Sequence, residues 1–139
     1  MKILIDSDVC LDVLVARVPF VIDSAKIFMA MESKIINGVI TAESFTNIYY
    51  ILRKQLGKQD AMNKLIKIRS ISSIGPVLSS SIDKALHSDW SDFEDALQHQ
   101  IALECNCKLI VTRNIKDYKL SLIDVFSPRD FVKYKLSKS

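Results

Sequence analysis

Four acidic side chains are candidates for catalysis. Each follows a short apolar run or lies near the start of a predicted helix: Asp6, Glu43, Asp95 and Asp117. Carboxylates that are held close together repel each other, which costs stability unless a cation lies between them. Oxygen-rich sites of this kind suit Mg²⁺ or Mn²⁺. Because such a metal can activate water and stabilise charge on a phosphate, these residues predict metal-assisted chemistry at a phosphate group.

Helical geometry places further polar side chains beside these candidates. At about 100° per residue, Asp92, Asp95 and His99 fall within about 60° of one another on one helix face. Glu43 and Asn47 are spaced i and i+4, so they also share a face. Polar side chains from separate helices are therefore expected to point toward the same region.

The elements that must position these residues alternate along the chain. The predicted strands are residues 2–5, 34–41, 71–78, 107–112 and 122–126. The predicted helices are residues 9–17, 22–33, 42–56, 59–69, 81–87, 91–105 and 128–136. Strands that alternate with helices predict an α/β fold with a parallel sheet covered on both faces. Ligands of such sheets bind beyond the carboxyl ends of the strands, where the acidic candidates lie.

The composition narrows the class of protein. The 139 residues fit a single domain, with 49% hydrophobic and 25% charged residues, as in ordinary globular proteins. The longest apolar runs are too short to span a membrane. The three cysteines include no CxxC pair, which argues against a disulfide framework or zinc site and fits a cytoplasmic location. A net charge of +3 permits contact with nucleic acid.

Several candidates near the first and second strands have structural alternatives. Asp6 could simply end a strand, although a carboxylate directly after a buried run is costly without a partner. Asp8 could cap the next helix as readily as bind a metal. Glu43, in a first helical turn, could only complement the helix dipole. These alternatives stay open at the level of sequence.

The second half of the chain offers similar alternatives. Ser91 and Glu94 form a capping-box pattern that predicts the start of a helix at this point. Asp92 could then do no more than complement the dipole of that helix. His99 is expected to be a satisfied or surface side chain more often than a ligand. Asn114 and Asp117 could be turn residues.

Four stretches of the chain resemble the PIN-domain family, especially the VapC-like toxins of type II toxin–antitoxin pairs. They are ILIDSDVCLDVLVARVPF, ITAESFTNIYYILRK, SDFEDALQHQIALECNCKLIVTRNIKDY and VFSPRDFV, in the order expected for the family. The resemblance implies a three-layer α/β/α sandwich with a mainly parallel sheet and divalent-metal-dependent ribonuclease activity. It also implies an RNA substrate, a homodimer and neutralisation by a small antitoxin.

The resemblance assigns roles to individual residues. Asp6 matches the first metal-binding Asp of the family, and Asp95 matches the carboxylate of its third motif, with Asp92 assisting. Asp117 would supply the fourth acid. The stretch Thr112-Arg113-Asn114 matches the TRD or TRN motif of the family, so these three residues are expected to shape the rim around the substrate.

The second motif departs from the family pattern. The family has a Glu in the helix that follows the second strand, and this chain has Asn47 at that place. Glu43 lies one turn earlier on the same face and could substitute for it. An Asn can bind a divalent cation only as a neutral ligand, so metal affinity depends on which of the two residues fills the position.

Two other functions compete with the ribonuclease. A haloacid-dehalogenase-type phosphatase has a similar Asp-x-Asp strand, but it needs a Lys and an acidic pair beyond its second motif, and only 25 residues follow Asn114. The other alternative is a catalytically degenerate PIN fold that serves as a binding or scaffold module. Asn47 and Asn114, at places where acids could lie, motivate this second alternative.

Overall fold

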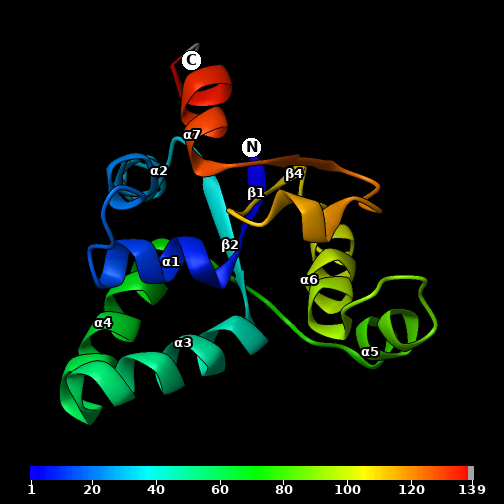
Figure 1. The fold of residues 1–139 in the computed structure, drawn as a ribbon, viewed down its shortest axis with the longest axis horizontal. Coiled ribbons are helices and arrows are strands. Elements are labelled where there is room, and N and C mark those ends of the chain that lie inside the picture. The colour runs from blue at the N-terminus through cyan, green and yellow to red at the C-terminus, as the bar shows by residue number, and fades with distance from the viewer. Residues whose placement is uncertain (138–139) are drawn as a thin grey trace.

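The computed structural model describes residues 1–137 and is built around a five-stranded sheet (Figure 1). The strands are β1 (Lys2–Ile5), β2 (Asn37–Thr41), β3 (Ser73–Gly75), β4 (Leu109–Val111) and β5 (Asp124–Phe126). Their order in the sheet is β3-β2-β1-β4-β5, and every pair of neighbours is parallel. Residues 138 and 139, which end the predicted domain, lie outside the described residues.

Helices cover both faces of the sheet. They are α1 (Ser7–Leu14), α2 (Val21–Glu32), α3 (Ala42–Leu56), α4 (Lys58–Ile71), α5 (Ser79–Leu86), α6 (Phe93–Glu104) and α7 (Pro128–Phe131). A 3₁₀ turn, η1 (Ile115–Tyr118), follows β4, and a π-helical turn, η2 (Val132–Leu136), follows α7. In Figure 1, α5 and α6 lie on one side of the sheet and the other helices lie on the opposite side. The predicted three-layer α/β/α sandwich is therefore confirmed.

Alternation along the strands explains why the sheet needs two helical layers. Ile3 and Ile5 point into the core beneath α1–α4 and α7, whereas Leu4 points into the core on the α6 side. In β4, Val111 likewise faces the first core and Ile110 faces the second. Successive side chains of a strand point to opposite faces, so a strand that is apolar throughout must be buried on both.

The helix at residues 42–56 has the bounds that the sequence predicts. Thr41 caps its first turn by accepting a hydrogen bond from Ser44 N. Gly57 ends the helix in a backbone conformation with φ of +86°, which a residue with a Cβ rarely adopts. This helix begins directly after β2, so it carries Glu43 to the edge of the sheet.

The starts of two other helices differ from the prediction. The α1 helix begins at Ser7, and its cap is Asp6, so the prediction of a start at residue 9 and the alternative that Asp8 is the cap are wrong. The α6 helix is capped by Asp92, whose Oδ1 accepts a hydrogen bond from Asp95 N at 3.0 Å. The prediction that Ser91 caps this helix is therefore wrong by one residue, and the neighbouring Asp92 is an equally good cap.

The β1 strand has the predicted bounds, and the other four strands are shorter than predicted. The β2 strand begins at Asn37, because Lys34 has a φ of 61° and turns the chain before it. The β3 strand, at one edge of the sheet, ends at Gly75, immediately before Pro76, which has no N–H to donate to a continuing ladder. Within residues 1–137, no helix has the length and apolar character needed to cross a membrane.

Candidate active site

A small polar pocket of about 150 Å³ lies at the carboxyl edge of the sheet. It is lined by Asp6, Ser7, Asp8, Glu43, Ser44, Asn47, Glu94, Asp95, Gln98 and Asn114. These residues come from the start of α1, from α3, from α6 and from the segment after β4. The strand order reverses at β1, where connections leave toward both halves of the sheet, and open parallel sheets bind ligands at such points.

Asp6 follows β1 directly and is a buried member of the pocket lining. Its backbone N–H donates to Val111 O at 3.0 Å, which continues the pairing of β1 with β4. Its carboxylate accepts hydrogen bonds from Ser7 N at 2.8 Å, Thr112 Oγ1 at 2.8 Å and Tyr118 Oη at 3.4 Å. Burial nevertheless raises the pKa of Asp6, because it outweighs these hydrogen bonds.

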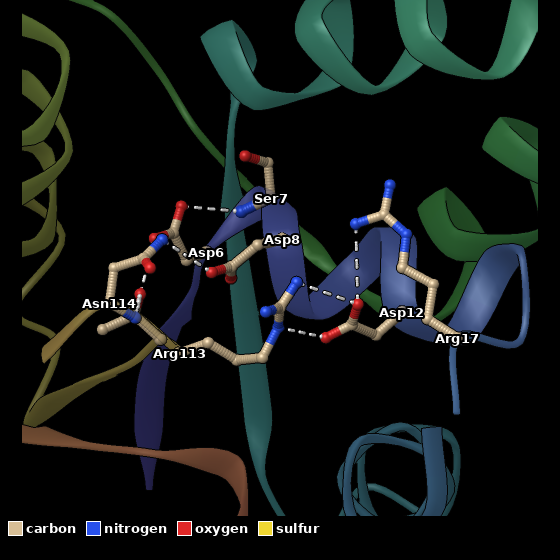
Figure 2. Close-up of polar contacts among 8 residues, drawn as sticks. Asp6, Ser7, Asp8, Asp12, Arg17, Arg113 and Asn114 are labelled. Carbon is tan, nitrogen blue, oxygen red and sulfur yellow. Dashed lines mark hydrogen bonds and ion pairs between the residues drawn. The ribbon is translucent and has the colours of Figure 1, made fainter. Parts of the chain in front are cut away.

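Asp8 places a second carboxylate beside the first (Figure 2). Asn114 Nδ2 donates to Asp8 Oδ2 at 3.1 Å, while Asp8 Oδ1 is buried and accepts no hydrogen bond. Burial and then the charge of Asp6 raise the pKa of Asp8 to about 7, and the cation of Arg113 opposes them. This favours the alternative that Asp8 is a metal ligand, because its Oδ1 accepts no hydrogen bond from the protein.

Glu43 from α3, with Glu94 and Asp95 from α6, completes the acidic lining. Burial raises the pKa of Glu43 to about 7, and the charges of Glu94 and Asp92 add to this effect. Burial also raises the pKa of Asp95 to about 7, with further contributions from Asp92 and Asp6. Carboxylates from separate elements thus repel one another across one pocket, as the sequence predicts.

The donor atoms of the pocket fit a hard divalent cation. Carboxylate and amide oxygens are the ligands that Mg²⁺ and Mn²⁺ prefer. The buried, unpartnered Asp8 Oδ1 and the raised carboxyl pKa values are two features that such a cation would relieve. Among residues 1–137, no three His, Cys, Asp or Glu side chains already have the spacing of a metal site, so the pocket carboxylates would have to move closer together to coordinate an ion.

Not every predicted site residue lies in the pocket. Asn47 lines it together with Glu43, one helical turn away. Asp92 and Asp117 lie outside the lining, the first as the exposed cap of α6 and the second on the exposed 3₁₀ turn. Both still act on the pocket, because their charges raise the pKa of Asp95.

The predicted rim residues separate into two kinds. Thr112 Oγ1 donates to Asp6 and accepts a hydrogen bond from Asn114 N at 3.0 Å, so two of the three residues orient pocket carboxylates. Arg113 instead turns away toward α1 and pairs with Asp12 (Figure 2). Its predicted contact with substrate is therefore less direct than the sequence suggests.

Gln98 and Tyr118 are parts of the site that are not predicted from the sequence. Gln98 Oε1 accepts a hydrogen bond from Thr41 Oγ1, and the buried amide of Gln98 faces the pocket, where it counteracts the rise in the pKa of Asp6. Its spacing of three residues from Asp95 was a usable signal, because it places the two side chains on neighbouring faces of α6. Tyr118 reaches Asp6 only through the turn after β4, which no local pattern reveals.

His99 has a structural role. Its Nε2 accepts a hydrogen bond from Leu122 N at 3.0 Å, and its ring packs against Trp90 with 4.7 Å between ring centroids. Burial lowers the pKa of His99. The alternative of a satisfied side chain is therefore confirmed.

The PIN domain family model matches residues 2–116, which include every element that contributes to the pocket. The chain belongs to the PIN domain family. Among known proteins it is similar to Ribonuclease VapC1 from Aquifex aeolicus (strain VF5), with 25% identity over 138 residues, 94% of this chain and 92% of that protein.

Solved structures share the fold. The toxin–antitoxin complex from Klebsiella pneumoniae matches with a TM-score of 0.68 and 17% identity, over 90% of this chain and 96% of that one. VapBC-1 from nontypeable Haemophilus influenzae matches with a TM-score of 0.68 and 10% identity, over 93% of this chain and 99% of that one. VapBC2 from Rickettsia felis, bound to a DNA fragment from its promoter, matches with a TM-score of 0.66 and 15% identity, over 91% of this chain and 98% of that one.

Proposed function

We propose that this chain is a divalent-metal-dependent endoribonuclease and the toxin of a type II toxin–antitoxin pair. The observation that carries the proposal is the convergence of Asp6, Asp8, Glu43 and Asp95 on one pocket at the carboxyl edge of the sheet. The similarity to Ribonuclease VapC1 supports RNA as the substrate. The fold shared with toxin–antitoxin complexes supports a small antitoxin as the partner.

The residues of the pocket would divide the work of phosphodiester hydrolysis. Asp6, Asp8 and Asp95, with Glu43 or Asn47, would hold Mg²⁺ or Mn²⁺, and Asp92 and Asp117 would add negative charge at the margin. When bound, such an ion supplies an activated water and stabilises charge on the phosphate. Thr112 and Tyr118 hold the Asp6 carboxylate in place from the protein side. Glu43 and Asp95 have pKa values of about 7 in the metal-free pocket, so they would lose their protons as the cation binds.

Two further features belong to the proposal. The chain would act as a homodimer, as the resemblance to the family implies, and sedimentation of the purified protein tests this. It would work in the cytoplasm, which fits the three free thiols of Cys10, Cys105 and Cys107.

A nuclease assay on a panel of tRNAs and mRNAs tests the activity. We expect cleavage with Mn²⁺ or Mg²⁺ and none with a chelator. Asp6→Asn and Asp95→Asn should abolish cleavage while the proteins stay folded, because Asn has the size of Asp and, at position 6, caps α1 as well as Asp does. Asp83→Asn, an exposed substitution on α5, is the matched control and should cleave normally. Full cleavage by a folded Asp6→Asn, Asp95→Asn double variant would refute the assignment.

The scaffold alternative keeps one observation in its favour, since Asn47 lines the pocket where the family resemblance leads us to expect a Glu. Calorimetric titration with Mn²⁺ separates the two functions, because a scaffold should show no binding that depends on Asp6. The match to the PIN domain family argues against the phosphatase alternative. A covalent aspartyl-phosphate on Asp6 would reverse that judgement.

A further inference from the structure

A buried ion pair joins α1 to the segment after β4. Asp12 is fully buried. Arg113 donates two hydrogen bonds to its carboxylate, from Nε to Oδ2 at 2.6 Å and from Nη2 to Oδ1 at 3.2 Å. Arg17 approaches the same carboxylate less closely, with Nη1 at 3.6 Å from Oδ1 (Figure 2). Burying a charge costs free energy even when it is paired, so a fully buried Asp on a helix that faces the core calls for a reason.

The guanidinium of Arg113 is also held from a second direction. Its central carbon lies 4.0 Å from the centroid of the Phe20 ring, so the planar group stacks on an aromatic side chain while its edge binds Asp12. A Lys could satisfy neither the two-pronged hydrogen bond nor the stacking. The geometry at this position therefore requires an Arg.

The place of Arg113 in the chain connects this pair to the pocket. Its two neighbours are Thr112, which donates to Asp6 at 2.8 Å, and Asn114, which donates to Asp8 at 3.1 Å. Asp8 and Asp12 lie four residues apart on α1, so they project from one face of the helix. Adjacent residues of the segment after β4 thus bind carboxylates that are one turn apart on α1.

We propose that the Asp12–Arg113 pair is a positioning device that sets the register of residues 112–114 against α1, so that Thr112 and Asn114 orient the two pocket carboxylates. This inference rests on the proposed function, because the two carboxylates need a fixed orientation only if they bind a cation. Asp12 and Arg113 would touch neither the cation nor the RNA. Groups that orient metal ligands typically change metal affinity about 10–100-fold when they are removed.

The test uses Arg113→Lys and Asp12→Asn, because each keeps the size of the side chain while removing the two-pronged contact. Circular dichroism first confirms that each protein is folded. We expect the Kd for Mn²⁺, measured by calorimetry, to weaken about 10–100-fold in both variants, and kcat on RNA to fall more than KM rises. Arg17→Ala is the matched control, since Arg17 binds the same carboxylate at longer range, and its Kd should equal that of the wild type.

A double variant distinguishes positioning from general weakening of the fold. Asn114→Ala alone should weaken Mn²⁺ binding, but in the Arg113→Lys background it should add less than about 2-fold, because Asn114 would already be misplaced. The proposal would be overturned if the losses of Mn²⁺ affinity in the Asn114→Ala and Arg113→Lys variants multiplied in the double variant. Wild-type affinity in both Arg113→Lys and Asp12→Asn would also overturn it.

A measurement on the metal-free protein separates this inference from the proposed function. The Asn114 side-chain amide gives its own NMR resonances, and we expect them to shift in Arg113→Lys and Asp12→Asn but to stay in place in Arg17→Ala. If the wild type neither bound Mn²⁺ nor cleaved RNA, the proposed function would fail. Unchanged Asn114 resonances in both variants would instead remove the positioning role.

Discussion

The binding of a divalent cation should release a predictable number of protons. Asp8, Glu43 and Asp95 each have a pKa of about 7 in the protein without metal. At pH 7 each of these three carboxyls is therefore about half protonated, so an ion that needs them ionised must displace about 1.5 protons from them, and any proton held by Asp6 adds to this number. Carboxyls with ordinary pKa values would release almost none at this pH.

The same reasoning fixes how the release depends on pH. With three groups of pKa about 7, the number of protons released should be larger at pH 6 than at pH 7 and small above pH 8. Affinity for Mn²⁺ should therefore rise steeply as pH increases toward 7 and level off above pH 8. The direction follows from the charges, because protons and the cation compete for the same oxygens.

Calorimetry in two buffers of different ionisation enthalpy measures the proton count directly. Asp95→Asn removes one titrating group, and it also removes a charge that raises the pKa of Glu43, so the release at pH 7 should fall by about 0.5 protons or slightly more. Asp83→Asn should leave it unchanged. Strong Mn²⁺ binding at pH 7 with a release below about 0.3 protons would show that the carboxyls are already ionised and would refute this account of the pocket.

Three further predictions concern stability and the unusual second motif. In the presence of a chelator, the free energy of unfolding should fall as pH rises from about 5 to 8, because the folded protein holds protons that the unfolded chain has lost; a flat profile in urea denaturation would contradict this. Arg113→Ala should lower the free energy of unfolding by about 3–5 kcal/mol, because it leaves Asp12 buried and poorly paired. Arg17→Ala should lower it by less than about 1 kcal/mol. Equal losses in the two variants would be inconsistent with the geometry. Asn47→Glu should tighten Mn²⁺ binding, and calorimetry showing weaker binding would mean that Glu43 already fills the position.

Much of the fold follows from local patterns in the sequence. The bounds of α3 are predicted correctly, because an amphipathic face runs from the end of a strand to a glycine that can adopt a positive φ. The apolar stretch of β1 ends at Asp6, and this abrupt change of polarity locates the edge where the pocket forms. Such features are encoded within a few residues of each other, so periodicity and composition detect them.

Other features depend on contacts that no local pattern encodes. Ser91 and Asp92 are both good helix caps, and only the folded protein shows that Asp92 takes the role at the start of α6. An Asp is usually found on the protein surface, yet Asp12 is fully buried, because it is paired with Arg113, which lies 101 positions away in the chain. The place of Arg113 could not be predicted for the same reason.

The order of the strands has a consequence for synthesis of the protein. The β1 strand is made first, but one of its two neighbours, β4, is not complete until Val111. Until then, one side of β1 offers unpaired backbone groups to any other extended chain, and Asp6 lacks its contacts with Thr112 and Tyr118. A partly translated chain therefore exposes a strand edge that can aggregate and lacks a formed pocket. Chains truncated before β4 should aggregate and should not cleave RNA.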